Sequence, residues 1–132
     1  MNYKKRGERV GDFKFLDSSV WIAFIIENKN KEIIETEEPL ALCSLSLFEI
    51  KRKLINDKVK KEDIERSISF IKNRSMVINV DEKIAEKAAE ISVERKVPSL
   101  DALIYCTSLQ NEGILFTRDN DFRGLPLVNI LS

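Results

Sequence analysis

The sequence predicts an α/β fold in which a mostly parallel sheet of four to five short strands is flanked by helices. Short apolar runs typical of strands alternate along the chain with helical segments of about 10 to 15 residues. The chain has 132 residues, which is enough for one domain with a single buried core and too few for two ordinary domains. Parallel pairing is favoured because a helix between two strands returns the chain to the edge where the next strand begins.

The first half of the chain supplies two strands, and a helix follows each. The segment Phe13–Asp17, with the sequence FKFLD, is typical of a short strand that ends on an acid, and a helix is expected from Ser18 or Ser19 onward. The second apolar run is Leu40–Cys43, and a helical segment over Leu45–Asn56 comes after it. This half therefore contributes two strand-helix units.

The second half continues the alternation. Asp81 is expected to cap an alanine-rich amphipathic helix that runs to about Arg95. Pro98-Ser99 opens another helix, which continues to about Gln110 and is expected to end at Gly113. The strands predicted in this half are Met76–Val80, Ile114–Thr117 and Leu127–Ile130.

Composition points to a soluble folded domain over residues 13–132, preceded by a basic and flexible tail over residues 1–12. Apolar residues make up 43% of the chain and charged residues 33%. The tail, MNYKKRGERVGD, lacks the apolar stretch of a signal peptide, and the longest apolar run, Val20–Ile26, is far too short to span a bilayer. We therefore expect a cytoplasmic protein without a membrane partner.

The net charge is zero, from 22 basic and 22 acidic residues. A domain that bound nucleic acid by charge alone would be clearly basic, so any action on nucleic acid needs another source of positive potential. Cys43 and Cys106 lie far apart within apolar segments, and the chain has no histidine. These cysteines are expected to be core residues, because neither a zinc site nor a disulfide framework has support.

Five acids are placed where a site is expected in such a fold. Asp17 ends the first strand, and Asp119 and Asp121 directly follow the strand Ile114–Thr117. Asp101 lies in the first turn of its helix, and Glu49 lies early in the helix after the second strand. Sites in open α/β sheets form outside the carboxyl ends of the strands, so these five side chains are predicted to share one rim.

Convergence of carboxylates requires a counter-ion. Two unit charges about 4 Å apart repel each other by roughly 4 kcal/mol at an effective dielectric constant near 20. An all-oxygen ligand set without histidine or thiolate favours Mg²⁺ or Mn²⁺. Such an ion activates water and neutralises charge on a phosphodiester, and it would supply the positive potential that the net charge lacks.

Each acid also has an ordinary structural interpretation. Asp17 suits a helix N-cap, and Ser46 to Glu49 has the spacing of a capping box. Asp101 is favourable in a first turn because of the helix dipole, and Asp119 to Asp121 suits an Asx-type turn. The functional interpretation therefore depends on the joint placement of the five acids.

The ordered segments FLDSSVWI, SLSLFEIKRKL, VPSLDALIYCTS and ILFTRDNDF resemble the PIN domain family, in particular the small VapC-type toxins of prokaryotic toxin–antitoxin pairs. The resemblance covers about Phe13 to Ile130 and implies a metal-dependent endoribonuclease with a cognate antitoxin. It also implies that the acids hold Mg²⁺ or Mn²⁺. The catalytic acids would be Asp17, Glu49, Asp101 and Asp119, with Asp121 as an additional metal ligand or supporting group.

Further residues follow from the same resemblance. Ser19 and Thr117 match hydroxyl positions of the family pattern and are expected near the substrate, and Arg118 and Arg123 are placed to contact RNA phosphates. The apolar run 20–26 would offer a surface to the antitoxin or to a second copy in a homodimer, with Trp21, Phe24 and Ile25 as contacts. Complete burial of this run is the alternative. For the basic run 51–53, a solvated helix face is favoured over RNA contact.

Two other functions remain open. The same fold and acids suit a housekeeping nuclease that matures RNA or cleaves DNA. A catalytically silent module that binds proteins is the second alternative, and it predicts no binding of divalent ions.

Overall fold

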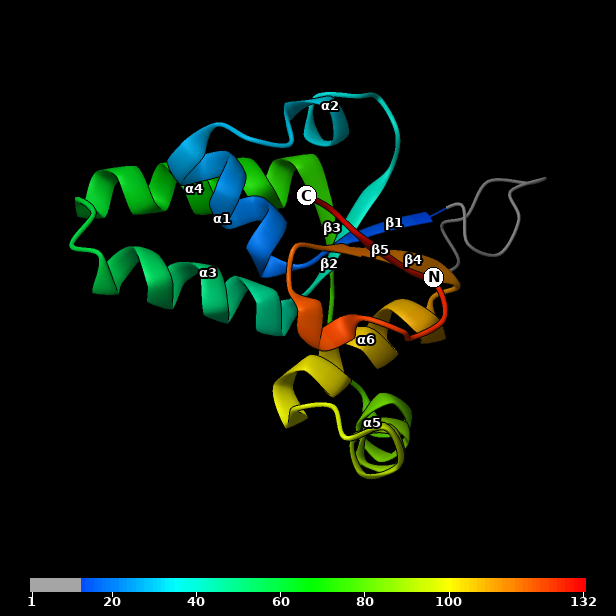
Figure 1. Cartoon of the computed structure of the whole chain (residues 1–132). Coiled ribbons are helices and arrows are strands. Elements are labelled where there is room, and N and C mark those ends of the chain that lie inside the picture. The colour runs from blue at the N-terminus through cyan, green and yellow to red at the C-terminus, as the bar shows by residue number, and fades with distance from the viewer. Residues whose placement is uncertain (1–12) are drawn as a thin grey trace.

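The computed structural model describes residues 13–132, and the predicted tail over residues 1–12 lies outside the described residues. Five parallel strands form one sheet in the order β3-β2-β1-β4-β5, as Figure 1 shows. The predicted α/β class and parallel sheet are confirmed. The strands are β1 (Phe13–Leu16), β2 (Leu40–Cys43), β3 (Ser75–Ile78), β4 (Gly113–Thr117) and β5 (Val128–Ile130).

Six α-helices and one 3₁₀ turn connect the strands within residues 13–132. The helices are α1 (Ser18–Glu27), α2 (Lys31–Ile34), α3 (Ser44–Asn56), α4 (Lys61–Arg74), α5 (Glu82–Arg95) and α6 (Ser99–Gln110), and the 3₁₀ turn η1 covers Asn120–Phe122. The predicted helices after β1 and β2 and the two between β3 and β4 are present. Helices α2 and α4 were not predicted from the sequence.

The reason that α4 was missed is its narrow apolar stripe. Ile64 and Ile71 are its buried residues, and they are two turns apart on a helix that is otherwise mostly charged or polar. Such a helix is held by tertiary packing of a thin face and has a weak periodic signal.

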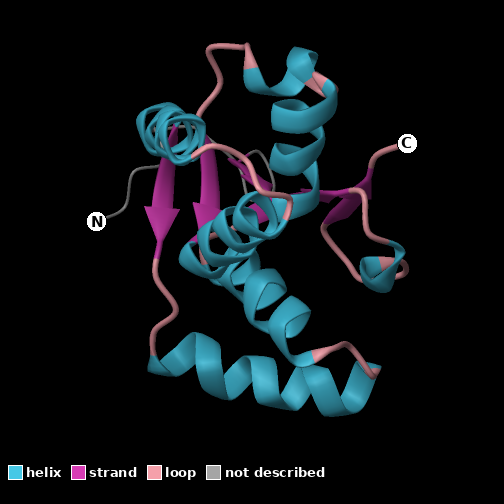
Figure 2. Ribbon diagram, turned by 90° about the vertical axis from the view of Figure 1, so that its left-hand side faces the viewer, coloured by secondary structure: helices cyan, strands magenta, loops and turns pink. Residues whose placement is uncertain are grey.

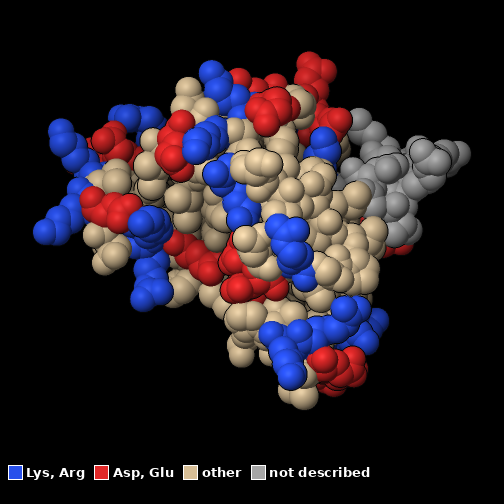
Figure 3. All heavy atoms as spheres, in the orientation of Figure 1, with Lys and Arg blue, Asp and Glu red and all other residues tan. Residues whose placement is uncertain are grey.

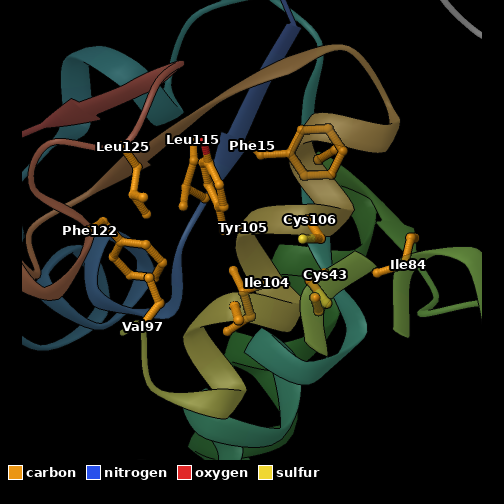
Figure 4. Close-up of a cluster of buried hydrophobic side chains, with 13 residues drawn as sticks. Phe15, Cys43, Ile84, Val97, Ile104, Tyr105, Cys106, Leu115, Phe122 and Leu125 are labelled. Atoms are coloured by element: carbon orange, nitrogen blue, oxygen red, sulfur yellow. The ribbon is translucent and has the colours of Figure 1, made fainter. Parts of the chain in front are cut away.

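The two faces of the sheet bury different side chains because residues alternate along each strand. Phe15 and Leu115 point to the face covered by α5 and α6, where Figure 4 shows them beside Tyr105 and Cys106. Leu16 and its neighbours Leu40, Leu42 and Phe116 point to the opposite face, which is covered by α1, α2, α3 and α4. Figure 2 shows the strands enclosed between these two groups of helices.

The central pair β1 and β4 is the topological switch point of the sheet. From β1 the chain moves outward to β2 and β3, and it then returns to β4 on the other side of β1. The Asp17 N–H extends the pairing by donating to the Phe116 carbonyl at 2.9 Å. Because ligand sites in such sheets form where the strand order reverses, the exits of β1 and β4 are the expected location of a site.

The predicted cap at the start of α5 is confirmed, and the predicted glycine at the end of α6 is wrong. The Asp81 carboxylate accepts from the Ile84 N–H at 2.8 Å and caps α5 as predicted. Gly113 does not end α6: it is the first residue of β4, and Glu112 takes the left-handed conformation instead, with φ of 56°.

The two cysteines are free and buried, as expected of core residues. Within residues 13–132, no helix has the length and apolar character needed to cross a membrane.

Candidate metal centre

The five predicted acids come together at the carboxyl edge of the sheet. Asp17 directly follows β1, Asp119 and Asp121 lie in the turn after β4, Asp101 is in the first turn of α6, and Glu49 is on α3. Burial and then the negative charges of the other four acids raise the pKa of Asp101, as expected when five acids lie near one another. Figure 3 shows acidic side chains gathered near the middle of this face, with Lys and Arg side chains around them.

Three of the acids form a compact ligand set. Asp101, Asp119 and Asp121 each place one carboxylate oxygen within 4.8 Å of the other two. The turn that makes this possible is an Asx turn, in which the Asp121 N–H donates to Asp119 Oδ1 at 2.9 Å. The turn and ligand interpretations of this segment are therefore compatible. The all-oxygen donor set fits a hard divalent cation such as Mg²⁺ or Mn²⁺.

Asp17 is the most enclosed of the five acids, with 3% of its surface exposed. Burial raises its pKa, and this is opposed by hydrogen bonds from the hydroxyls of Ser19 and Thr117. Asp17 occupies the N-cap position of α1, but its side chain makes no capping hydrogen bond there. Its carboxylate instead accepts hydrogen bonds from Ser19 Oγ and Thr117 Oγ1, and both donor oxygens lie 2.8 Å from Asp17 Oδ2.

Glu49 does not belong to a capping box. Helix α3 begins at Ser44, so Ser46 is already inside the first turn, and its buried hydroxyl has no hydrogen-bond partner. Glu49 Oε1 instead accepts from Ser18 Oγ at 2.9 Å, which connects α3 to the start of α1. Burial raises the pKa of Glu49, with further contributions from the charges of Asp17 and Asp119.

The pKa of Asp101 reflects its crowded surroundings. Burial and then the charges of the neighbouring carboxylates raise its pKa from 3.8 to about 7. A carboxyl group that is half-protonated near neutrality is the expected result when acids converge without a cation. A bound divalent ion would restore the ionised form by replacing repulsion with attraction.

Ser19 and Thr117 lie beside Asp17, while Arg118 directly precedes Asp119 in the chain and Arg123 directly follows η1. Ser19 and Thr117 direct their hydroxyl hydrogens at Asp17 rather than outward. Arg118 donates from Nη1 to the Ser132 carbonyl at 2.9 Å, and Arg123 donates from Nη2 to Asn120 Oδ1 at 2.7 Å. A guanidinium has five N–H donors, so both arginines retain donors for other acceptors.

The apolar run on α1 is only partly available to a partner. Trp21 is fully buried in the core, with none of its surface exposed. Phe24 and Ile25 are partly buried, and Phe24 stacks on Phe70 of α4 with ring centroids 5.8 Å apart. Ile26 is 49% exposed. Val20, Trp21 and Ala23 of the run are buried, and Ile22, Phe24 and Ile25 pack against the same core with part of their surface exposed.

Ser18 belongs to the site, although the sequence did not predict a role for its side chain there. It was considered only as the start of a helix, although its hydroxyl reaches Glu49. Two successive serines after an acid at a helix start were the available signal, because successive residues of a helix point in different directions and can serve different acids.

Comparisons with known proteins agree with this architecture. The family model of the PIN domain matches residues 14–126. A solved toxin–antitoxin complex from Klebsiella pneumoniae superposes with a TM-score of 0.73 at 24% identity, covering 88% of this chain and 95% of that chain. No curated protein matches the sequence closely enough to count as a relative.

Two further solved structures give the same result. VapBC2 from Rickettsia felis, bound to a DNA fragment from its promoter, has a TM-score of 0.73 at 18% identity, with 90% of this chain and 97% of that chain covered. Mycobacterium tuberculosis VapC20, described as a Sarcin-Ricin loop cleaving toxin, has a TM-score of 0.70 at 17% identity, with 89% and 98% covered. At these identities the likeness shows the fold, and the match to the family model shows that the chain belongs to the PIN domain family.

Proposed function

We propose that this protein is a metal-dependent endoribonuclease that hydrolyses RNA phosphodiester bonds and acts as the toxin of a toxin–antitoxin pair. The observation that carries the proposal is the convergence of five carboxylates, without histidine, at the switch point of a PIN domain fold. The five acids come from four separate parts of the fold: the exit of β1, α3, α6 and the turn after β4. Their mutual repulsion is explained by a divalent ion that they bind together.

The residues divide into direct ligands and supporting groups. Asp101, Asp119 and Asp121 have oxygens close enough to share one ion, which we propose is Mg²⁺ or Mn²⁺. Asp17 is a further proposed ligand, Glu49 completes the negative field around the ion, and hydroxyls on α1 and β4 hold both of these acids. When bound, the ion supplies Lewis-acid activation of a water and neutralises charge on the phosphodiester.

Arg118 and Arg123 are proposed to contact the RNA backbone. Arg118 lies between β4 and Asp119, and Arg123 directly follows η1, so both flank the last acids. Contacts of this kind position the phosphate chain and carry no base specificity.

The role as a toxin is supported by the structural neighbours, several of which are toxin–antitoxin complexes. We propose a cognate antitoxin as the protein partner, a homodimer as the assembly and the cytoplasm as the location. Phe24 and Ile25, together with the exposed Ile26, are the residues of α1 that remain for such a contact.

The test is cleavage of a mixed RNA pool by the wild type and Asp101→Asn, with Mg²⁺, with Mn²⁺ and with EDTA. We expect cleavage with either ion, none with EDTA, and loss to background in the variant, because an amide neither balances the ion's charge nor lets Asp101 act as an anionic ligand. The matched control is Asp57→Asn, since Asp57 is a surface acid paired with Lys53. Full activity in Asp101→Asn contradicts the proposal.

Two alternatives have distinct results in the same assay. Preferential cutting of a DNA duplex or a precursor transcript would favour a DNA-cleaving or RNA-maturing nuclease. Absence of cleavage, together with no heat of divalent-ion binding in calorimetry, would favour the silent protein-binding module.

A further inference from the structure

Two hydroxyl groups meet the buried Asp17 carboxylate on one of its two oxygens. Ser19 Oγ and Thr117 Oγ1 both lie 2.8 Å from Asp17 Oδ2, and the two hydroxyl oxygens are 3.3 Å apart. A hydroxyl has a single hydrogen to donate. Both hydrogens are used on Asp17, so neither hydroxyl is available as a donor to a substrate phosphate.

The backbone fixes the orientation of both hydroxyls. The Arg118 N–H donates to Ser19 Oγ at 2.9 Å, and the Asp119 N–H donates to Thr117 Oγ1 at 3.0 Å. These N–H groups belong to the segment that leads from β4 to Asp119. A continuous path of hydrogen bonds thus runs from the exit of β4, through the two hydroxyls, to the acid at the exit of β1.

The path distinguishes the two oxygens of Asp17. Each carboxylate oxygen has about two acceptor positions, and both hydroxyls bind Oδ2 while Oδ1 receives neither. We propose that Ser19 and Thr117 are positioning residues that hold Asp17 so that Oδ1 is the oxygen it presents to the divalent ion. This inference rests on the proposed function. It assigns the two hydroxyls to Asp17 rather than to RNA, the role that the sequence resemblance suggested.

The expected effect is on metal affinity. Groups that orient a metal ligand typically contribute about 10-fold to 100-fold to metal affinity. Thr117→Val keeps the shape of the side chain and removes its hydroxyl, so we expect a loss of Mn²⁺ and Mg²⁺ affinity of about that size. Thr117→Ser keeps the hydroxyl and is expected to recover most of the affinity.

The experiment is calorimetric titration of the full chain with Mn²⁺ and with Mg²⁺, for wild type, Thr117→Val, Thr117→Ser and Ser19→Ala. The control is Thr107→Val, because Thr107 is also a buried threonine, and its hydroxyl donates to the Leu103 carbonyl away from the acids. RNA cleavage at saturating Mn²⁺ gives KM and kcat as a second readout. If Thr117→Val fails to fold, Ser19→Ala carries the test, since Ser19 is partly exposed.

The inference is supported if Thr117→Val and Ser19→Ala lose metal affinity, Thr117→Ser and Thr107→Val keep it, and KM for RNA is unchanged at saturating metal. It is overturned if the variants bind Mn²⁺ like the wild type, if Thr117→Ser loses as much as Thr117→Val, or if only KM for RNA rises. A wild type that binds no divalent ion removes the proposed function, and this inference with it. A wild type that binds the ion alongside unaffected variants removes this inference alone.

Discussion

The Asp101 carboxyl group lies partly buried among four other carboxylates, and these surroundings raise its pKa from 3.8 to about 7. The folded chain therefore binds a proton at Asp101 over a pH range in which the unfolded chain has lost it. Stability that comes from this proton is complete below about pH 4 and is lost as the pH rises to about 7. The pKa values of Asp17 and Glu49 are also raised, so they act in the same direction.

Removal of the Asp101 charge should therefore stabilise the metal-free protein at alkaline pH. The full shift from 3.8 to about 7 corresponds to about 4 kcal/mol. Because Asp101 is partly open to water, which screens its charge, we expect Asp101→Asn to recover about 1 to 2 kcal/mol at pH 8 in EDTA. For a chain of this length each kcal/mol raises Tm by about 4 °C, measured by thermal unfolding.

The pH series supplies the control for this prediction. At pH 4 the two proteins should differ much less in unfolding temperature, because the unfolded chain has then lost only part of its Asp101 proton. Asp57→Asn should follow the wild type throughout. A wild type whose Tm is flat between pH 4 and pH 8 in EDTA would show that Asp101 is ionised without cost.

At the residue scale, the position of the acids was predictable and their hydrogen bonding was not. Each acid directly follows a strand or lies in the first two turns of a helix, so the parallel topology brings all five to one rim. Two hydroxyls donate to Oδ2 of Asp17, and Ser18 donates to Glu49. These hydrogen bonds depend on side-chain rotamers, and two of the three join elements that are far apart in the sequence, so the sequence did not reveal them. The burial of Trp21 was likewise hidden, since seven apolar residues in a row do not indicate which side of a helix faces the core.

At the element scale, strands were easier to predict than the helix at the edge. The strands are short, apolar and bounded by polar residues, so their predicted ends differ from the observed ones by at most two residues, as in β3, predicted as Met76–Val80 and observed as Ser75–Ile78. Helix α4 gave no clear signal, yet its last residue makes an important connection. Arg74 donates to the carbonyls of Ile34 at 2.6 Å, Thr36 at 2.7 Å and Glu38 at 3.1 Å.

Arg74 therefore attaches the end of α4 to the segment between α2 and β2. Hydrogen bonds from a charged group contribute about 1.5 to 3 kcal/mol, so we expect Arg74→Met to lose about 2 kcal/mol of unfolding free energy, measured by urea denaturation. Arg74→Lys should recover little, because an ammonium lacks the planar fork that reaches three carbonyls. The carbonyls lie before β2, at the sheet edge opposite the acids, so RNA cleavage by the folded variant should be unchanged.

A surface arginine on the same helix provides the comparison. Arg66 pairs with Asp63 at 2.9 Å with 77% of its side chain exposed, so Arg66→Met should change stability little. Equal losses in Arg66→Met and Arg74→Met would mean that the three carbonyl contacts contribute nothing beyond general helix stability. Loss of cleavage in folded Arg74→Met would mean that the two edges of the sheet are coupled.

At the scale of the whole molecule, the net charge is zero, but the positive and negative charges are unevenly placed on the surface. The chain has equal numbers of basic and acidic residues, yet acids collect at one edge of the sheet. The metal-free site is therefore a negative patch next to Arg118 and Arg123 in the chain, and it would repel the proposed RNA substrate. At physiological salt the screening length is about 8 Å, so the field of the nearest acids dominates over the distant surface charges.

This distribution predicts that the divalent ion is needed for RNA to bind, before any bond is cut. We expect fluorescence anisotropy of a labelled single-stranded RNA to stay near its free value in EDTA at 150 mM NaCl, and to rise when Ca²⁺ is added, because Ca²⁺ takes the same oxygen ligands. Asp101→Asn should respond to Ca²⁺ weakly, and Asp57→Asn like the wild type. Added NaCl at matched ionic strength should weaken binding rather than promote it, since sodium screens the arginine contacts without occupying the site. Equally tight RNA binding in EDTA and in Ca²⁺ would place the binding energy on arginines and lysines alone, and would limit the acids to the chemical step.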